Sequence, residues 1–427
     1  MAEIICVEGN EVVLQVRVKL SGSMLEMEEQ IQLAVNTVGM VATEEALKRF
    51  DTIGTPIQIG SIRMSSKGKV RKRYESPYGA VDVARHVYQT SAGGKTYCPL
   101  DESARIVTSS TPRFAKQVSS KYARLSAKEV MDDLKTNHGR PVVRSFLQNI
   151  VDVVGGIAQA TEEDWMYETP KQDEPVTTVS VSLDGTCVFM SGDGWREAMT
   201  GTVALYSSVG ERLHTIYLGA APEYGKAKFL ERLEQEVYAI KLQYPGAIYV
   251  GIADGAKTNW DFLERHTQCQ VLDFYHATEY LADASYAMHP IDACERKLWL
   301  DLACHRLINE SNAATELLNE MKQMLPKRTK QGLIDKLKAA ITYFTNQNHR
   351  MDYPHYRSKN LPIGSGVTEA ACKTLVKQRL CQSGMKWKNQ GISMVLRLRA
   401  LISTKGRWEQ FWERINQSGL IGLAELC

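Results

Sequence analysis

Hydrophobic and polar positions follow one set of patterns before about residue 175 and another after it. An alternating apolar run at residues 12–18 predicts a strand, and apolar residues at helical spacing over 27–50 predict an amphipathic helix. A basic stretch then leads into strands that end near residues 97–101. We therefore expect a small α+β region over residues 1–110.

Residues 113–155 have the apolar spacing of helices. The Ser126-Ala-Lys-Glu129 pattern predicts a capping box and then a helix that buries Val130 and Leu134. A glycine-containing turn at residues 137–140 follows, and Pro141 suits the first position of the next helix. That helix presents a helically spaced apolar set: Val143, Phe146, Leu147, Ile150 and Val154.

A helix, a four-residue turn with glycine and a second helix are typical of a helix-turn-helix DNA-binding domain, here expected over residues 111–160. Any helical corner has the same pattern, so a purely structural role stays open. In the DNA-binding interpretation, Arg140 and Arg144 at the start of the second helix would contact bases or phosphates.

The acidic segment 161–175, with Pro170, predicts a linker. Beyond it the pattern becomes mixed α/β. The predicted strands cover residues 177–183, 202–206, 213–218, 247–253 and 270–274, with helices at 226–243 and 259–266. We expect the first part of an α/β core at 176–276, a helical insertion at 277–355, and the rest of the core with basic C-terminal helices at 356–427.

Composition limits the class of protein. Hydrophobic residues make up 44% and charged residues 24% of 427 residues, which is typical of folded globular proteins. No apolar run reaches the ~20 residues that span a bilayer, and the N-terminus lacks a signal-peptide pattern. The nine cysteines include no CxxC pair, so we do not expect a disulfide framework or a four-ligand zinc site. We expect the protein to work in a reducing cytoplasm.

Positive charge is concentrated in the C-terminal part of the chain. Residues 357–414 hold twelve Lys/Arg and three Asp/Glu, a net +9, so the remainder carries −6 of the overall +3. Such a segment indicates a polyanionic partner, although a solvated helix face would have the same composition. A second basic stretch contains Lys67, Lys69, Arg71, Lys72 and Arg73.

Three carboxylates stand at the ends of predicted elements. Asp184 and Asp254 each follow a strand, and Glu369 lies in the first turn of a helix opened by Gly364-Ser365-Gly366. Adjacent parallel strands would bring the two aspartates to one edge of the sheet. Converging carboxylates repel one another, and Mg²⁺ relieves this because it prefers oxygen ligands. Two such ions ~3.5–4 Å apart support phosphoryl transfer.

Each acid also has an ordinary structural interpretation. Asp184-Gly185 and Asp254-Gly255 are common turn dipeptides, and Glu369 has Lys373 at i,i+4 as an ion-pair partner. The three acids therefore carry a functional argument only as a set.

Five blocks resemble the DDE transposases of bacterial insertion sequences of the Kra group, relatives of the Mutator and hAT superfamilies. Three of them surround the acids: Leu183-Asp184-Gly185-Thr186, Ala253-Asp254-Gly255-Ala256-Lys257 and residues 363–373. Asp273-Phe-Tyr-His276 is similar to their (C/D)xxH signature, and residues 379–387 to their tail block. The resemblance covers residues 176–412 in the family's order.

The resemblance implies an RNase H-like catalytic core interrupted by a helical insertion, with Mg²⁺, or Mn²⁺ in its place, held by Asp184, Asp254 and Glu369. His276 would lie near the scissile strand and Asp273 would help to place it; a capping or core histidine is the alternative. Relatives often carry an N-terminal zinc ribbon before a Pro-Leu-Asp motif. Here Pro99-Leu100-Asp101 is present but only Cys98 precedes it, so no zinc is expected.

A basic strip beyond Glu369 is expected to bind DNA. Lys373 and Lys377 follow the glutamate by one and two helical turns, suited to holding phosphates. The strip continues with Arg379, Lys386 and Lys388, and Trp387 or Trp260 would stack on an unpaired base unless they belong to the core.

The expected function is therefore that of a mobile-element transposase. It would bind terminal inverted repeats and target DNA as a homodimer or higher oligomer, with no membrane partner, in the bacterial cytoplasm at the nucleoid. Two rivals remain: a domesticated DNA-binding regulator, disfavoured by the intact acid triad, and an RNase H-like nuclease without strand transfer.

Overall fold

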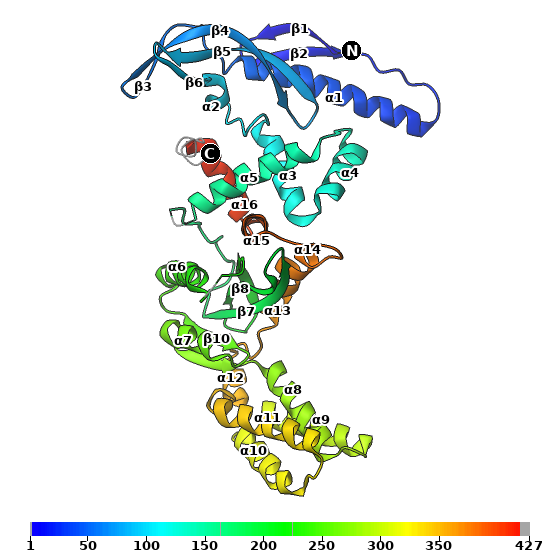
Figure 1. Ribbon diagram of the computed structural model, residues 1–427, viewed down its shortest axis with the longest axis vertical. Helices are drawn as coiled ribbons and strands as arrows, with labels where there is room; N and C mark the ends of the chain where they lie inside the picture. The colour runs from blue at the N-terminus through cyan, green and yellow to red at the C-terminus, as the bar shows by residue number, and fades with distance from the viewer. Residues whose placement is uncertain (1, 163, 224, 419–427) are drawn as a thin grey trace. The chain divides into compact units, whose positions relative to one another are not determined.

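A computed structural model describes residues 2–162, 164–223 and 225–418, and the chain forms two compact units (Figure 1). The first unit runs to Tyr167 and includes Arg397–Ile402 and the chain from Arg407. The second comprises Glu168–Leu396 and Ser403–Gly406. The division after Tyr167 falls inside the predicted linker, whereas part of the C-terminal helices, expected in the core, belongs to the first unit.

The first unit begins with a hairpin and a long helix. Strands β1 (Ala2–Glu8) and β2 (Glu11–Val16) pair antiparallel, and α1 spans Met24–Lys48. The sequence predicted only the second strand, because the apolar residues of the first are consecutive rather than alternating. The helix begins earlier than predicted, since Ser23 and Glu26 form a capping box that fixes its start.

A four-stranded sheet and a short helix follow. The sheet has the order β3-β4-β5-β6 and all its neighbours are antiparallel. Its buried side packs Tyr74, Val81 and Val83 against Leu100. The elements are β3 (Ile57–Ile59), β4 (Ile62–Glu75), β5 (Ala80–Thr90), β6 (Gly93–Tyr97) and α2 (Pro99–Ser103).

Three helices complete this part: α3 (Pro112–Arg124), α4 (Ala127–His138) and α5 (Arg144–Ala160). The capping box is confirmed, because Glu129 N–H donates to Ser126 Oγ at 3.3 Å and Ser126 N–H to the Glu129 carboxylate at 2.7 Å. Pro141 does not open the second helix. The chain leaves α4 through Gly139 at φ 62° and stays extended at Val143, so α5 starts at Arg144.

The predicted DNA contact at Arg140 is wrong. Its side chain is 6% exposed; Nε donates to the Ser76 carbonyl at 3.0 Å and a terminal nitrogen to Glu75 at 2.5 Å. The guanidinium also lies 5.2 Å from the centre of the Phe114 ring. Arg140 therefore stabilises the first unit internally, while Arg144 is exposed on the first turn of α5.

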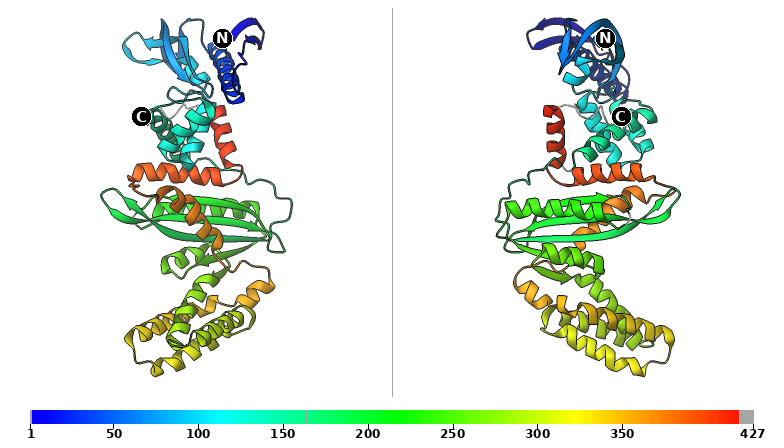
Figure 2. Two further views of the ribbon diagram at one scale, coloured as in Figure 1. Left: turned by 90° about the vertical axis from the view of Figure 1, so that its right-hand side faces the viewer. Right: turned by 60° about the vertical axis from the view of Figure 1, so that its left-hand side comes forward.

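The second unit is built on a five-stranded sheet of order β11-β10-β7-β8-β9. Its long strands are drawn in green in Figure 2. Strands β7, β8 and β9 are antiparallel neighbours, and β10 and β11 run parallel to β7. They span Thr178–Met190 (β7), Gly194–Tyr206 (β8), Arg212–Ala220 (β9), Ile248–Ala253 (β10) and Cys269–Leu272 (β11). Mixed α/β architecture is thus confirmed.

Two helical layers cover opposite faces of this sheet. A Cβ added to Gly201 in β8 would lie 3.1 Å from Phe229 and 3.3 Å from Leu233, both on α6 (Ala227–Gln243). The next residue, Thr202, points to the other face and its hydroxyl lies 2.6 Å from that of Thr368 in α13 (Gly366–Ala371). The sheet therefore separates α6 from the helix that carries Glu369.

Helices account for the rest of the second unit (Figure 1). Helix α7 (Lys257–His266) connects β10 to β11 along the chain, and α8 (Phe274–Met288) follows β11. The insertion continues with α9 (Ala293–Asn309), α10 (Ala313–Met324), η1 (Leu325–Lys327), α11 (Gln331–Gln347), η2 (Asn348–Arg350) and α12 (Tyr353–Ser358). Beyond α13 lie η3 (Cys372–Lys377), α14 (Gln378–Leu380) and α15 (Asn389–Ser403), of which Arg397–Ile402 belong to the first unit. The last helix, α16 (Arg407–Ser418), belongs to the first unit.

Two chemical features of the described residues bear on later arguments. Within that part of the chain, no helix combines the length and apolar character needed to cross a membrane. The eight cysteines there are all free thiols.

Candidate active site

Asp184 lies on β7 where that strand loses its parallel partner. Strand β10 pairs with β7 only as far as Ile252 opposite Ser182, while β7 continues with β8 to Met190. Asp184 is thus inside a strand, not at its end or in a turn as predicted, because the β7–β8 hairpin extends six residues past it. Its side chain points to the α13 face, since Asp184 pairs with Thr200 and alternation puts Thr200 and Thr202 on one side.

Asp254 directly follows β10 and lies in a turn held by the helical insertion. Its carboxylate accepts the Ala256 N–H at 3.2 Å, and its carbonyl accepts the Tyr343 hydroxyl at 2.6 Å. Gly255 has φ +113°, a conformation that glycine tolerates. Gln347 of the same helix α11 donates to the Gly255 carbonyl at 3.3 Å. The insertion therefore helps to shape the site.

Glu369 is carried by a helix that changes pitch just after it. The Ser365 hydroxyl lies 3.2 Å from Glu369 Oε1, and the ion pair with Lys373, the structural alternative, does not form between these two described residues. After Ala371 the chain becomes a π-helix over Cys372–Lys377. π-Helical segments are rare in proteins overall, and those that occur are often found at functional sites.

Asp273 joins two segments that are distant in sequence. It is completely buried at the N-terminus of α8. One carboxylate oxygen accepts the His276 N–H at 3.0 Å, and the other accepts the Ser365 N–H. The same carboxylate thus caps α8 and holds the loop that precedes Glu369.

His276 lies between Glu369 and Glu279 in the first turn of α8. Its Nε2 is 3.9 Å from Glu369 Oε1 and its Nδ1 is 3.2 Å from Glu279 Oε2. Burial alone would lower the pKa of His276, but the negative charges of Asp273, Glu279 and Asp254 outweigh it and the net pKa is raised. A third of the side chain is exposed, so His276 is not a core residue.

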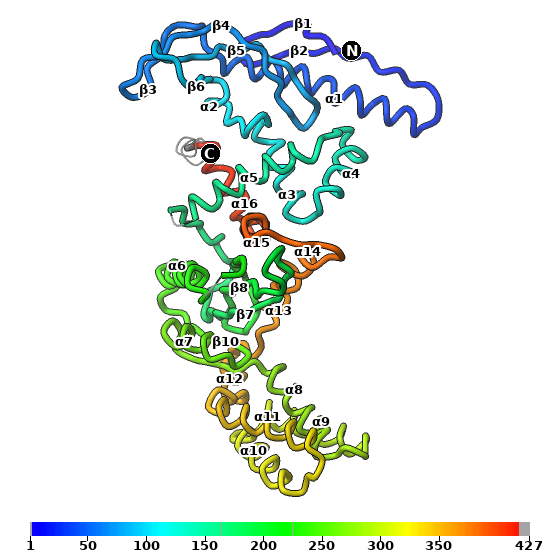
Figure 3. The backbone as a smooth tube through the Cα atoms, viewed as in Figure 1, coloured from blue at the N-terminus to red at the C-terminus, as the bar shows by residue number. Residues whose placement is uncertain are grey.

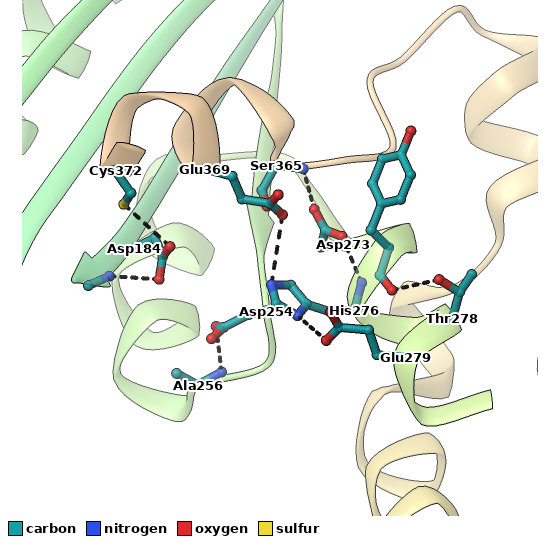
Figure 4. Close-up of polar contacts among 12 residues, drawn as sticks. Asp184, Asp254, Ala256, Asp273, His276, Thr278, Glu279, Ser365, Glu369 and Cys372 are labelled. Carbon is teal, nitrogen blue, oxygen red and sulfur yellow. Dashed lines mark hydrogen bonds and ion pairs between the residues drawn. The ribbon is translucent and has the colours of Figure 1, made fainter. Parts of the chain in front are cut away.

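The carboxylates of Asp184, Asp254 and Glu369 turn toward a common region beside His276 (Figure 4). Burial raises the pKa of Asp184, and the charge of Asp254 adds to the shift. The Gly185 N–H and the Cys372 thiol oppose it by donating to Asp184 at 2.7 Å and 3.4 Å. Burial, followed by the charge of Asp184, raises the pKa of Cys372 to about 11, so this thiol stays protonated and donates.

The donor chemistry of these acids fits a hard divalent cation. A half-buried carboxylate with a raised pKa, beside a second carboxylate, is the environment that a cation would relieve. Among the residues described here, no three His, Cys, Asp or Glu side chains are yet close enough to hold one ion together. The three carboxylates are therefore the type of ligand that Mg²⁺ prefers and they face a common region. To bind one ion together, they would need to rotate about their side-chain bonds.

The predicted basic strip is only partly a surface feature. Lys373, Lys377, Lys386 and Lys388 are exposed, but Arg379 is 2% exposed and lies 5.2 Å from the centre of the Trp387 ring. The π-helix also breaks the 3.6-residue spacing from which Lys373 and Lys377 were placed on one face. Arg379 therefore packs inside the unit and is unsuited to contact DNA.

Neither tryptophan is a free stacking surface. Trp387 is half-buried; its Nε1 donates to the Leu380 carbonyl at 2.9 Å and its backbone pairs with Phe189 and Ser191 at the end of β7. Trp260 is 3% exposed, and the Arg350 guanidinium lies 4.3 Å from the centre of its ring. The stacking prediction for Trp260 is wrong.

Three site residues were missed from sequence. Cys372 follows Glu369 by three residues, about one helical turn, and directly follows α13; its thiol donates to Asp184. Tyr343 comes from the middle of α11, 89 residues from its partner Asp254. Ser365 was noted only as part of a glycine-flanked helix start, and its backbone N–H proves to be the contact with Asp273.

No protein-family model matches this sequence, and a search of curated proteins also found no match.

Proposed function

We propose that this protein is a DDE-type DNA transposase with an RNase H-like core. The observation that carries the proposal is the placement of Asp184 on β7 and of Asp254 directly after the adjacent parallel strand β10, with Glu369 on a helix at the same face of the sheet. The strand order, three antiparallel strands followed by two parallel to the first, supports an RNase H-like assignment. The helical insertion between Asp254 and Glu369 fits the interrupted form of that core.

Asp184, Asp254 and Glu369 would hold the metal ions. Mg²⁺, or Mn²⁺ in its place, would supply an activated water or 3′-hydroxyl and stabilise the leaving oxygen in phosphoryl transfer. His276, beside Glu369 and with a raised pKa, is suited to donate a proton or a hydrogen bond to a phosphate oxygen. Cys372 orients one oxygen of Asp184 by donating to it.

The DNA partners would be the terminal inverted repeats of the element and the target. Exposed Lys373 and Lys377 are close in sequence to Glu369 and suited to phosphate contacts, and Lys386 and Lys388 extend this basic surface. Arg144 is the exposed residue of the helical region that retains the recognition role, so a helix-turn-helix domain stays a proposal there. Synapsis of two ends requires a homodimer or larger assembly, and DNA as substrate implies a site of action at the bacterial nucleoid.

The decisive experiment uses duplexes that carry the DNA flanking the gene. With Mg²⁺, the wild-type protein should nick at the element end and join a pre-cleaved 3′-hydroxyl to a target duplex. Asp184→Asn should reduce cleavage by at least ~1,000-fold, the scale set by loss of a main electrostatic group, while end binding persists. Binding without any Mg²⁺-dependent cleavage would favour a regulator, and cleavage without joining would favour a plain nuclease.

A further inference from the structure

The basic strand β4 is used neither by the proposed active site nor by the helical region. It contains Arg63, Lys67, Lys69, Arg71, Lys72 and Arg73 against one acidic residue, Glu75. It pairs along most of its length with β5 to form a long antiparallel ribbon in the first unit (Figure 3). The faces of this ribbon differ sharply.

The pairing register assigns each basic residue to a face. Lys69, Arg71 and Arg73 stand opposite His86, Ala84 and Asp82, so all six point to one side of the ribbon. Lys72 and Tyr74 point to the other side, where Tyr74 is fully buried and Lys72 donates to Asp101 at 2.9 Å. Alternation therefore separates one internally paired lysine from three cations on the outer face.

The outer face remains positive after its internal ion pairs are considered. Lys69 and Arg73 are 56% and 67% exposed. Asp51, which lies 3.9 Å from Lys69, has a side chain that is only 8% exposed and is bonded to His86 at 3.0 Å. Asp82 lies 3.7 Å from Arg73 in an exposed pair of the kind that contributes little. Arg71 is exposed and forms no ion pair with the described residues. Exposed Arg63 and Lys67 extend the same strand toward its start.

We infer that this outer face, defined by Lys69, Arg71 and Arg73, binds the phosphate backbone of duplex DNA. Alternate residues on a strand are about 6.8 Å apart, so the cations form a straight, evenly spaced row suited to a linear polyanion with a charge every ~3.4 Å per strand. A two-stranded ribbon also fits the major groove. The inference rests on the proposed function only in the choice of DNA as partner.

The chemistry of the face disfavours other partners. Besides the three cations it presents Ala84 and Asp82, with His86 paired to Asp51, and no large apolar or aromatic anchor, which a tight protein interface or an interfacial membrane contact would need. Binding must therefore be mainly electrostatic. Phosphate contacts of this kind are independent of base sequence and strongly dependent on salt.

Fluorescence anisotropy of the full chain with a labelled duplex, in EDTA and over a salt series, tests the inference. Removing three phosphate contacts by Lys69→Ala, Arg71→Ala and Arg73→Ala should lower the slope of log K against log salt by about 3. The charge-preserving variant Lys69→Arg, Arg71→Lys, Arg73→Lys should keep the wild-type slope. A matched control removes three exposed lysines of the other unit: Lys322, Lys327 and Lys330.

An unchanged slope in the ribbon variant, at an unchanged melting temperature, overturns the inference. An equal loss in the matched control overturns it too, because the effect would then be one of net charge. Mg²⁺-dependent cleavage is measured separately with wild-type protein. If wild-type protein cleaves DNA but the ribbon variant keeps the wild-type salt slope, only the DNA-binding role of the ribbon is refuted. If the ribbon variant has a reduced slope but wild-type protein does not cleave, only the transposase proposal is refuted.

Discussion

Asp273 is the residue whose removal should most clearly test how the site is assembled. Its carboxylate accepts two backbone N–H groups, from His276 at the start of α8 and from Ser365 ahead of α13, and is completely buried. Asp273→Ala removes both bonds and leaves the buried Ser365 N–H without its acceptor. Asp273→Ser keeps a helix-capping oxygen for His276 but is too short to serve Ser365 as well.

The magnitude follows from the two contacts. A hydrogen bond to a charged group stabilises a protein by about 1.5–3 kcal/mol, and relief of burying the charge offsets part of the sum. We therefore expect Asp273→Ala to lower the local free energy of opening by about 3 kcal/mol, or roughly 100-fold in the opening equilibrium. Asp273→Ser should lose about half of that free energy.

Hydrogen exchange followed by mass spectrometry measures this change where it occurs. Peptides covering the start of α8 and residues 361–371 should exchange faster in Asp273→Ala, and only residues 361–371 should do so in Asp273→Ser. Peptides from α3 in the first unit serve as the internal control. Unchanged protection of residues 361–371 in the alanine variant would refute the claim that this carboxylate holds the Glu369 loop.

Three further changes test the electrostatics and the turn. Asp184→Asn should raise the melting temperature of the protein without added metal at neutral pH. The pKa of Asp184 is raised in the folded state, so its ionised carboxylate lowers stability at a pH above that pKa. The same variant should abolish stabilisation by Mg²⁺, and a lower melting temperature than wild type would contradict the argument. Gly255→Ala should destabilise the second unit by about 1–3 kcal/mol, since φ is +113° and the new Cβ would lie 3.0 Å from Tyr343, as urea unfolding would reveal. Without added metal, NMR should give His276 a pKa above 6.5, and Glu279→Gln should lower that pKa. The stabilisation of the folded protein by protonated His276 should be complete below pH 6.5 and lost as pH rises through the raised pKa. A His276 pKa below 6.5 would show that burial dominates.

Periodicity predicted most of the second unit because its strands and helices are long and buried. The run at 247–253 proved to be β10, and the helix at 226–243 proved to be α6 with Phe229 and Leu233 on its inner face. The end of β7 was predicted too early: the strand continues beyond Asp184 through its pairing with β8, and Val188 and Met190 are buried there.

Side-chain surroundings were much harder to predict. Arg140 and Trp260 have surface-like or dual-purpose chemistry, yet each is buried by partners distant in sequence. Tyr343 reaches the site only because the helical insertion brings it to Asp254, 89 residues away in the sequence. A single sequence indicates which residue types carry chemistry, but it does not contain the long-range contacts that decide which of them face the site.

The three acids differ in how firmly the fold fixes them. Asp184 and the backbone leading to Asp254 belong to adjacent hydrogen-bonded strands, so their separation is set by the sheet register. Glu369 reaches them through a loop attached at Ser365 to Asp273, at the root of the helical insertion. A shift of α8 would therefore move Glu369 relative to Asp184. Asp273 is therefore the connection through which the insertion would control the position of Glu369.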